Sequence, residues 1–506
     1  MADFAAAFQQ LLDPSLLAVI AASAIYGTLF GSIPGLSATM AVALIVPITY
    51  FLSPLAALAA VVTLEACAIS AGDIPSALVR IPGTPASAAY ADDLYHLGQR
   101  GEYHRALGVC IVFSVIGGLF GVAVLALFAG PFASIATWFT VAEYFWLYVL
   151  GLGCAVVVSR GSALKGALAL LLGLLLSTVG LSPVHTEARF TFAQPELYQG
   201  INFIPALVGL FGLSEVLRNV RALGGPVDVL VVQKAAAEVG LIRSLRAVFG
   251  GTLALFWRRR WQTLQASAVG TLIGILPGAG ADIAAWVTYG LSKRASTKPE
   301  EYGHGSIEGV ADAGAANNSA LAGAWVPALT LGIPGDSITA IVLGIMMMKN
   351  LQPGPQIFEK QAVLVHSLLL VFVLANLALL PAGYLAIRAS GALMRVPRHT
   401  LLPCIVLFCV LGSYSIGGSY FDVGLMLAMG VLGFALERWQ VPLGPIVLGI
   451  ILGGPLEERF VQALTASQGS LSVLFARPPA AILGVAAIGV WSWPLVIAWR
   501  ARRRVG

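Results

Sequence analysis

The nine residues from Gly27 to Gly35 read GTLFGSIPG, and those from Gly270 to Gly278 read GTLIGILPG. Six of the nine positions are identical, and the other three are small or apolar in both copies. Each copy lies inside an apolar run and ends in a Pro-Gly step. Proline removes a backbone donor and glycine permits positive φ, so each copy predicts a helix that breaks at this step. The chain therefore contains one structural phrase twice.

The repeat extends beyond these nine residues. The first half continues to a second Pro-Gly step within IPGTPAS (81–87), and the second half to another within IPGDSIT (333–339). The chain thus divides into a first membrane repeat (1–217), a basic linker (218–262) and a second membrane repeat (263–506).

The composition is that of a membrane protein. The chain has 506 residues, of which 58% are hydrophobic and 10% charged, whereas soluble chains average about 25% charged residues. Apolar stretches near the length of a spanning helix predict about ten to thirteen transmembrane segments, with re-entrant hairpins at the breaks. We expect an all-α polytopic membrane protein.

Basic residues suggest its orientation. By the positive-inside rule the linker and the C-terminal RARRRVG are cytoplasmic. The stretch 241–264 mixes apolar and basic residues at helical spacing, as in a helix at the membrane surface or a solvated linker helix. The second half inserts KRASTKPEEYGHGSIEG where the first has an uncharged FLSP, which predicts opposite orientations and hence an inverted repeat. The net charge of +5 fits basic loops and requires no nucleic-acid partner.

Broken helices in lipid are typical of ion and substrate sites. A helix that begins after a break directs its positive end inward, and the unwound carbonyls can face a cation. The breaks therefore predict a site for an anion and a co-transported cation. Short polar side chains near the breaks suit these roles: Ser37, Thr39, Thr84, Ser87, Asn317, Asn318, Ser319, Ser337 and Thr339.

Four acidic residues lie in or beside apolar runs, where a carboxylate is costly and often functional. Asp282 and Asp336 belong to the repeated motifs, and we predict that they bind the cation, with Na⁺ as one possibility. Glu65 and Asp73 have no acidic counterpart in the other half, and their role stays open.

The motifs GTLFGSIPGLSATMAVALIVPITY, IPGTPASAAYADD, GTLIGILPGAGADIAA, GSIEGVADAGAANNSA and LTLGIPGDSITAIVLG, in this order, resemble the large membrane subunit of tripartite tricarboxylate transporters, the TctA family. The resemblance covers nearly the whole chain. It implies that the chain lies in a bacterial inner membrane and functions together with a small four-helix membrane subunit and a periplasmic solute-binding protein. It also implies uptake of di-, tri- or aromatic carboxylates driven by Na⁺ or H⁺, with no further cofactor. Matching family positions here are Pro34, Gly35, Pro82, Gly83, Pro85, Pro277, Gly278, Gly280, Asn317, Asn318, Pro334 and Gly335.

One stretch departs from the family pattern. EACAISAGDIPSALVR (65–80) stands where the family has a Gly-Gly-Ser-like sequence. Asp73 and Arg80 in it could change substrate choice or pair with each other. The departure leaves the identity of the carboxylate open.

The sequence also bears on three other functions. An enzyme is disfavoured, because HExxH, GxSxG and Walker A patterns are absent and GAGAD places its acid one residue later than the GxGD of intramembrane aspartyl proteases. A channel is compatible with the repeat, but alternating access explains a site between inverted halves better. A stand-alone carboxylate transporter would need no binding protein. We expect one helix bundle to move relative to a scaffold of less broken helices.

Overall fold

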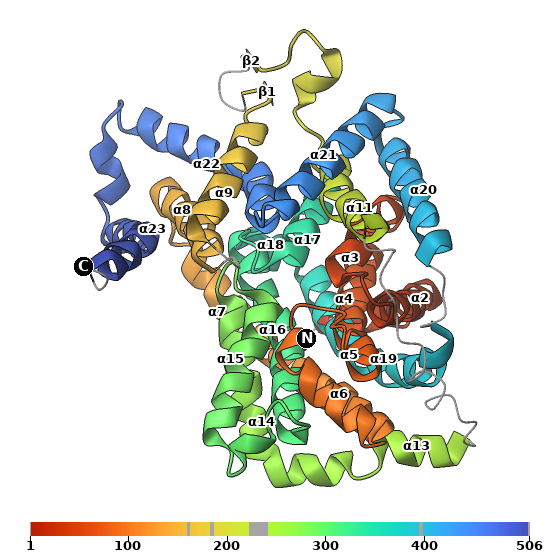
Figure 1. The fold of residues 1–506 in the computed structure, drawn as a ribbon. Coiled ribbons are helices and arrows are strands. Elements are labelled where there is room, and N and C mark those ends of the chain that lie inside the picture. The colour runs from red at the N-terminus through yellow and green to blue at the C-terminus, as the bar shows by residue number, and fades with distance from the viewer. Residues whose placement is uncertain (1, 159–161, 183–186, 222–240, 394–397, 504–506) are drawn as a thin grey trace.

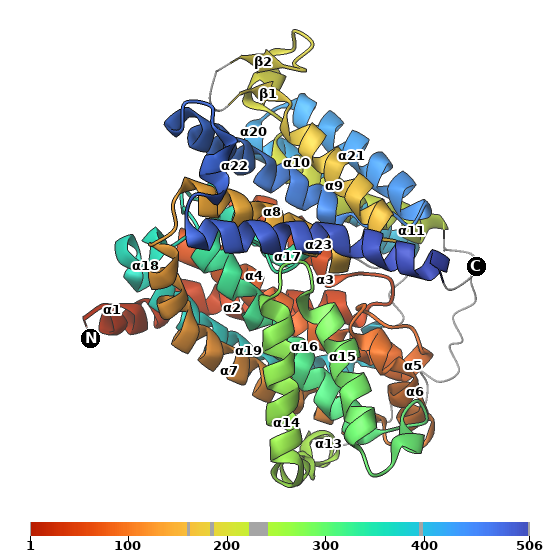
Figure 2. The same ribbon diagram turned by 90° about the vertical axis from the view of Figure 1, so that its left-hand side faces the viewer.

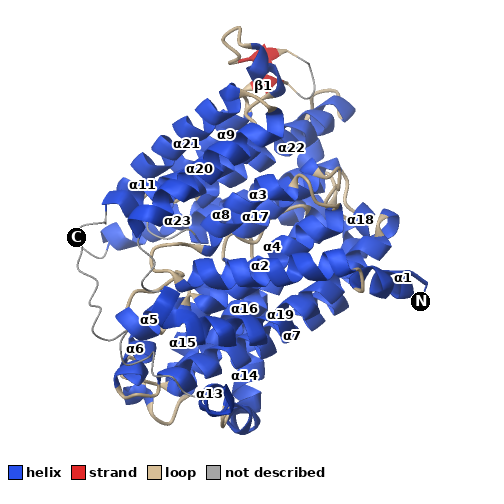
Figure 3. Ribbon diagram, turned by 90° about the vertical axis from the view of Figure 1, so that its right-hand side faces the viewer, coloured by secondary structure: helices blue, strands red, loops and turns tan. Residues whose placement is uncertain are grey.

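The computed structural model describes all residues except 1, 159–161, 183–186, 222–240, 394–397 and 504–506 (Figure 1). Figure 3 shows that helices dominate and that the strands of the described residues form one small hairpin. The hairpin pairs β1 (Gly180–Leu181) with β2 (Ala188–Arg189) in antiparallel register. The all-α class expected from the sequence is confirmed.

The first half contains α1 (Ala2–Leu11), α2 (Pro14–Ser32), α3 (Ala38–Thr49), α4 (Pro54–Ala71), α5 (Asp73–Val79), α6 (Ala91–Gln99), α7 (Tyr103–Ala136), α8 (Val141–Val158), α9 (Ala163–Ser177), α10 (Phe203–Leu207) and α11 (Ser214–Arg221). A π-helical segment, η3 (Val208–Leu213), joins α10 to α11. Short 3₁₀ turns lie at η1 (Ser87–Ala89) and η2 (Pro195–Gln199).

The second half contains α13 (Leu241–Phe249), α14 (Thr252–Ile275), α15 (Gly280–Ala295), α16 (Ile307–Leu331), α17 (Ser337–Met348), α18 (Gln356–Lys360), α19 (Ala362–Leu393), α20 (Arg398–Gly417), α21 (Tyr420–Arg438), α22 (Gly444–Ala466) and α23 (Pro478–Arg503). The 3₁₀ turns here are η4 (Pro299–Glu301) and η5 (Leu471–Phe475).

Many of these helices are suited to a bilayer. Within the described chain, seven are long and apolar enough to span one, and five shorter helices are also apolar. The seven are Pro14–Ser32, Pro54–Val79, Tyr103–Ala136, Phe203–Arg221, Ala362–Ala392, His399–Gly417 and Tyr420–Arg438. This makes the chain a multi-pass membrane protein, while the total of ten to thirteen crossings stays a prediction.

The two halves pack according to the same plan. Helix α2 packs on α4 as α14 packs on α16, and α1 packs on α19 as α13 packs on α7. The halves also interlock, because α7 lies against α16 and α19 against α4. The boundaries at 217 and 263 and the opposite orientation of the halves stay predictions.

The glycines of the repeated phrase let each copy pack closely against its neighbouring helix. A Cβ atom at Gly31 would lie 2.3 Å from the carbonyl oxygen of Ala68, and one at Gly274 would lie 2.2 Å from that of Ala320. The first glycine of each phrase meets the same partner helix one turn earlier. A Gly-xxx-Gly pattern lets two helix backbones touch. The phrase therefore forms the α2–α4 and α14–α16 contacts as well as the break that follows.

The predicted linker is partly built into the second half. The helix expected over 241–264 is instead two helices, because the chain turns at Gly250-Gly251 between α13 and α14 (Figure 1). Helix α14 also bends at Arg259, whose guanidinium forms ion pairs of 2.7 Å with Glu308 and with Asp312. Residues 222–240 of the linker lie outside the described chain.

Two bundles can be distinguished in Figures 2 and 3. An upper bundle contains α8–α11 and α20–α23, and a lower bundle contains α1, α2, α4–α7, α13–α16 and α19. The short helices α3 and α17 lie between them, since α3 contacts both α4 and α20 and α17 contacts both α4 and α22.

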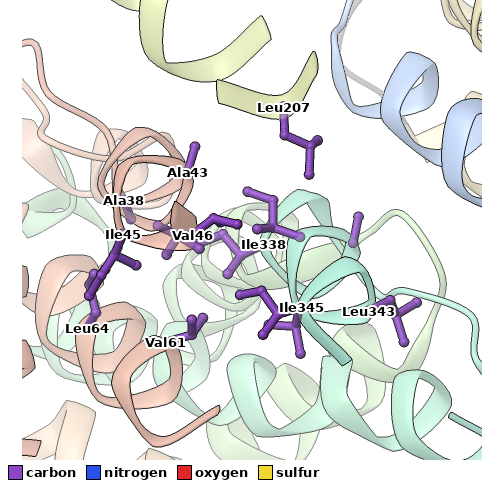
Figure 4. Packing of buried hydrophobic residues seen from close by; sticks show 14 of the residues in the cluster. Ala38, Ala43, Ile45, Val46, Val61, Leu64, Leu207, Ile338, Leu343 and Ile345 are labelled. Carbon is purple, nitrogen blue, oxygen red and sulfur yellow. The ribbon is translucent and has the colours of Figure 1, made fainter. Parts of the chain in front are cut away.

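Apolar packing holds α3 and α17 in place. Val46 of α3, Val61 of α4 and Ile345 of α17 are fully buried, and Figure 4 shows them in one cluster together with Leu207 of α10. Such close packing fixes side chains and backbones with little freedom. The N-termini of two helices that follow breaks are thereby held near each other at the boundary between the bundles.

Candidate substrate site

All four Pro-Gly steps fall where helices are interrupted, as predicted. We name these interruptions break 1 (33–37), break 2 (80–86), break 3 (276–279) and break 4 (332–336). They separate α2 from α3, α5 from η1, α14 from α15, and α16 from α17. Gly35 and Gly278 adopt φ of 87° and 81°, a conformation that favours glycine.

Backbone hydrogen bonds fix the breaks in the fold. The Gly278 N–H of break 3 donates to the Gly335 carbonyl of break 4 at 2.8 Å. In the first half, the Asn219 side-chain amide of α11 donates to the Gly35 carbonyl at 2.7 Å. Unwound groups of breaks 1, 3 and 4 are thus satisfied within the protein, as a low-dielectric surrounding requires.

The four breaks converge on one cavity of about 550 Å³. This volume is in the range of small-molecule sites. The first turns of α3, α15 and α17 line it, so the N-terminal ends of these helix dipoles face it. Eight predicted site residues lie in its wall: Ser37, Thr39, Thr84, Gly278, Gly280, Asp282, Asp336 and Ser337.

Two of the lining polar residues also cap helices. Ser37 accepts the Met40 N–H at 3.2 Å as N-cap of α3. Asp336 forms a capping box at the start of α17, where its Oδ1 accepts the Thr339 N–H at 2.8 Å and the Thr339 hydroxyl at 2.7 Å. Asp336 therefore has one oxygen committed to the helix, and Thr339 serves as its capping partner without lining the cavity.

The remaining predicted residues near the breaks shape them from behind the wall. Pro34, Gly35, Pro82, Gly83, Pro277, Pro334 and Gly335 are absent from the lining. Ser87 is fully buried and exchanges hydrogen bonds with Thr84: its hydroxyl accepts the Thr84 N–H at 3.2 Å, and its own N–H donates to the Thr84 hydroxyl at 3.1 Å. These residues hold the conformation of the breaks.

The structure does not bring the predicted Asn317-Asn318 pair to the cavity. Both lie buried in the middle of α16. The Asn318 amide donates to the Ser114 carbonyl of α7 and to the Asn376 side chain of α19, each at 3.1 Å. Asn318 therefore joins three helices of the lower bundle.

Arg218 is a residue of the cavity that its sequence position did not reveal. It falls in the predicted linker, but it lies in the last turn of α11 and lines the cavity. Its guanidinium pairs with Glu215, and its Nη1 lies 3.7 Å from Glu437 of α21. SEVLR (214–218) directly follows the last apolar run of the first half. This continuity could have indicated that Arg218 belongs to a membrane helix and not to the linker.

The acids of the departing stretch lie deep in the protein. Glu65 and Asp73 are 0% and 1% exposed. Of the two possibilities left open for this stretch, the pairing of Asp73 with Arg80 does not occur, because Arg80 forms a 2.6 Å ion pair with Asp92 at the surface. Asp73 lies instead beside Tyr90.

The cation site predicted at Asp282 and Asp336 has both carboxylates in the wall of one cavity. Among the described residues, no three His, Cys, Asp or Glu side chains are grouped to hold a metal ion. A sodium ion here would therefore depend on hydroxyl and backbone carbonyl oxygens in addition to carboxylate.

Comparison with known proteins agrees with this architecture. The model of the tripartite tricarboxylate transporter TctA family matches residues 17–448. An uncharacterised 52.8 kDa protein in the TAR-I ttuC' 3' region of Agrobacterium vitis is 34% identical over 476 residues, which cover 94% of this chain and 92% of the relative. An uncharacterised protein in the TAR-II ttuC' 3' region of the same organism is 36% identical over 214 residues, which cover 42% of this chain and 88% of the relative. No solved structure matches the chain. With four Pro-Gly breaks around one cavity and a family match over most of its length, the chain belongs to the tripartite tricarboxylate transporter TctA family.

Proposed function

We propose that this chain is the membrane subunit of a secondary transporter that imports carboxylate anions by cation symport. A periplasmic solute-binding protein delivers the anion, and a small four-helix membrane subunit completes the complex in a bacterial inner membrane. The linker and the C-terminus face the cytoplasm.

The observation that carries this proposal is the convergence of all four breaks on one cavity. Helix N-termini bind anions through their free N–H groups and their dipoles. Hydroxyls of Ser37, Thr84 and Ser337 add neutral donors. Arg218 adds a guanidinium, which in this conformation pairs with Glu215 and would turn to the carboxylate when it binds. This set of groups suits a carboxylate.

The place of the cavity between the bundles supports alternating access. Its wall is formed on the lower side by the breaks and on the upper side by α11, α21 and α22. A relative movement of the two bundles would open the cavity to one side of the membrane and then to the other. A fixed channel does not need such a boundary.

Uptake into proteoliposomes that contain the whole complex tests the proposal. Citrate, succinate and phthalate serve as labelled probes, under an inward Na⁺ or H⁺ gradient. We expect concentrative uptake of at least one probe that requires both the gradient and the binding protein. Passive equilibration would indicate a channel, and uptake without the binding protein would indicate a stand-alone transporter.

Asp336→Asn should strongly reduce gradient-driven uptake, because asparagine keeps the N-cap of α17 but removes the negative charge from the cavity. Asp13→Asn is the matched control, since Asp13 caps α2 by accepting the Ser15 N–H at 2.9 Å on the exposed surface. We expect the control to transport like the wild type. Equal rates and equal cation dependence for Asp336→Asn would exclude Asp336 from the cation site.

Arg218→Gln should raise KM for the carboxylate by about tenfold or more, since losing one partner of a charged contact costs about 2 kcal/mol or more. Arg218→Lys should recover only part of the affinity, because lysine lacks the planar fork that holds a carboxylate. Arg221→Gln, in the same helix but outside the cavity wall, is the control. Initial rates at varied substrate concentration measure the effect, and an unchanged KM would show that Arg218 does not face the substrate.

A further inference from the structure

Glu65 has an unusual environment in the middle of α4. Its side chain is completely buried, and neither carboxylate oxygen completes a hydrogen bond with any described residue. The Trp325 indole of α16 lies beside it, and the indole nitrogen also lacks a partner of normal geometry. An acid in this position needs either a bound proton or a cation.

Glu65 lies directly behind the cavity wall. Ile69, one turn further along α4, lines the cavity. Helices α2, α3, α5, α7, α16, α17 and α19 pack against α4, and within the described chain Asp336 at the start of α17 is the titratable group whose charge acts on Glu65. Asp336 itself lines the cavity. Glu65 is therefore one helical turn away from a residue of the cavity wall.

The surroundings favour a proton over a metal cation. An ionised carboxylate without donors or a counter-ion is very costly in a low dielectric. Sodium, a hard cation like calcium, needs several oxygen ligands, whereas a proton can be held by a carboxylate that has no hydrogen-bond partner among the described residues. A proton requires only the carboxylate itself.

We propose that Glu65 is the proton-carrying group that couples carboxylate uptake to the proton gradient. The carboxyl is protonated in the conformation described here. On release, its O–H bond breaks, the electron pair stays on Glu65, and the proton passes to water in the cavity, whose wall includes Ile69 one turn along α4. This inference rests on the proposed function and names its coupling ion.

The repeat places a titratable group at this position in the first half only. The offset that relates Pro82 to Pro334 also relates Glu65 to Asn317, which is buried at the equivalent position of α16. An amide is similar in shape to a carboxyl but does not titrate near neutral pH. The two halves thus share a buried polar position, of which only the first can carry a proton. This asymmetry assigns the coupling role to the first half.

Infrared difference spectra of the purified complex test the protonation without any transport. Wild type minus Glu65→Gln at neutral pH should show the carbonyl band of a protonated carboxylic acid. Thr63→Val is the control, because Thr63 is on the same helix, is fully buried and also has an unpartnered hydroxyl. Its difference spectrum should lack this band. Absence of the band from the Glu65→Gln difference would overturn the proposal.

Transport then tests the coupling. With citrate, succinate and phthalate as probes, Glu65→Gln should lose accumulation driven by a pH gradient but retain exchange of internal for external substrate, which needs no net proton movement. Exchange also shows that the variant is folded. If Glu65→Gln accumulated substrate under a pH gradient as the wild type does, the role of Glu65 would be refuted. Failure of the wild type to exchange any probe would refute the proposed function, while the infrared result would still decide the protonation of Glu65.

Discussion

Gly278→Ala should abolish transport while Gly290→Ala leaves it intact. Gly278 adopts φ of 81°, and a Cβ atom there would lie 2.4 Å from the Cα of Ala155 in α8. A left-handed conformation costs a residue other than glycine about 1–2 kcal/mol, and the contact with a backbone atom cannot be relieved by a side-chain rotation. Break 3 would have to move away from the upper bundle.

Movement of break 3 would disturb the site at two points. The Gly278 N–H donates to the Gly335 carbonyl, so break 4 would lose its link to break 3. Gly278, Gly280 and Asp282 would also shift in the cavity wall. We therefore expect Gly278→Ala to lose uptake while it remains largely folded, because the changed atoms lie at the boundary between the bundles.

Gly290 is the matched control in the helix that follows break 3. It lies inside α15 with a normal helical φ, and a Cβ atom there would meet nothing within 4 Å. Alanine in a helix interior is favoured over glycine by about 1 kcal/mol. Uptake rates and thermal unfolding in detergent measure both variants. Wild-type uptake by Gly278→Ala would show that the geometry of break 3 is not needed.

The sequence predicted the breaks because their cause is local. Proline and glycine interrupt a helix wherever the partners lie, so Pro34-Gly35 and Pro334-Gly335 were found without knowledge of the fold. Ser37 and Ser337 could be placed in the site for the same reason, since each follows a break directly. The residues at the starts of the helices that follow the breaks line the cavity, so finding the breaks also located part of its wall.

Partners that are distant in the chain decided where the prediction failed. Asn318 was assigned to the site as a polar residue in an apolar run, but its amide is bonded by groups 204 and 58 positions away. Arg218 was assigned to the linker because its contact with the cavity depends on how α11 packs beside α21. The close contacts of Gly31 and Gly274 needed the opposing helices as well. Local rules do not contain this information.

Asp93→Ala should lower the free energy of unfolding by about 3 kcal/mol or more, since leaving a buried donor unsatisfied costs about 1–3 kcal/mol. Asp93 in α6 is fully buried. Its Oδ1 accepts the N–H groups of Gly303, Gly305 and Ser306, each at 2.8 Å, and its Oδ2 accepts the Tyr289 hydroxyl at 2.6 Å. The bonds to Gly305 and Ser306 are themselves buried, so water does not readily replace them.

The effect should spread along α16, because Ser306 is the N-cap of that helix and accepts the Gly309 N–H at 3.1 Å. Asp93 thus joins the first half to the start of the helix that ends in break 4. Asp92→Ala is the control: Asp92 is half exposed and pairs only with exposed Arg80 among the described residues, and such surface pairs contribute about 0–1 kcal/mol. Thermal unfolding of the two variants in detergent compares them directly. A similar midpoint for both would mean that the contact of Asp93 with the 303–306 loop does not hold the halves together, whereas a large loss confined to Asp93→Ala assigns it that role.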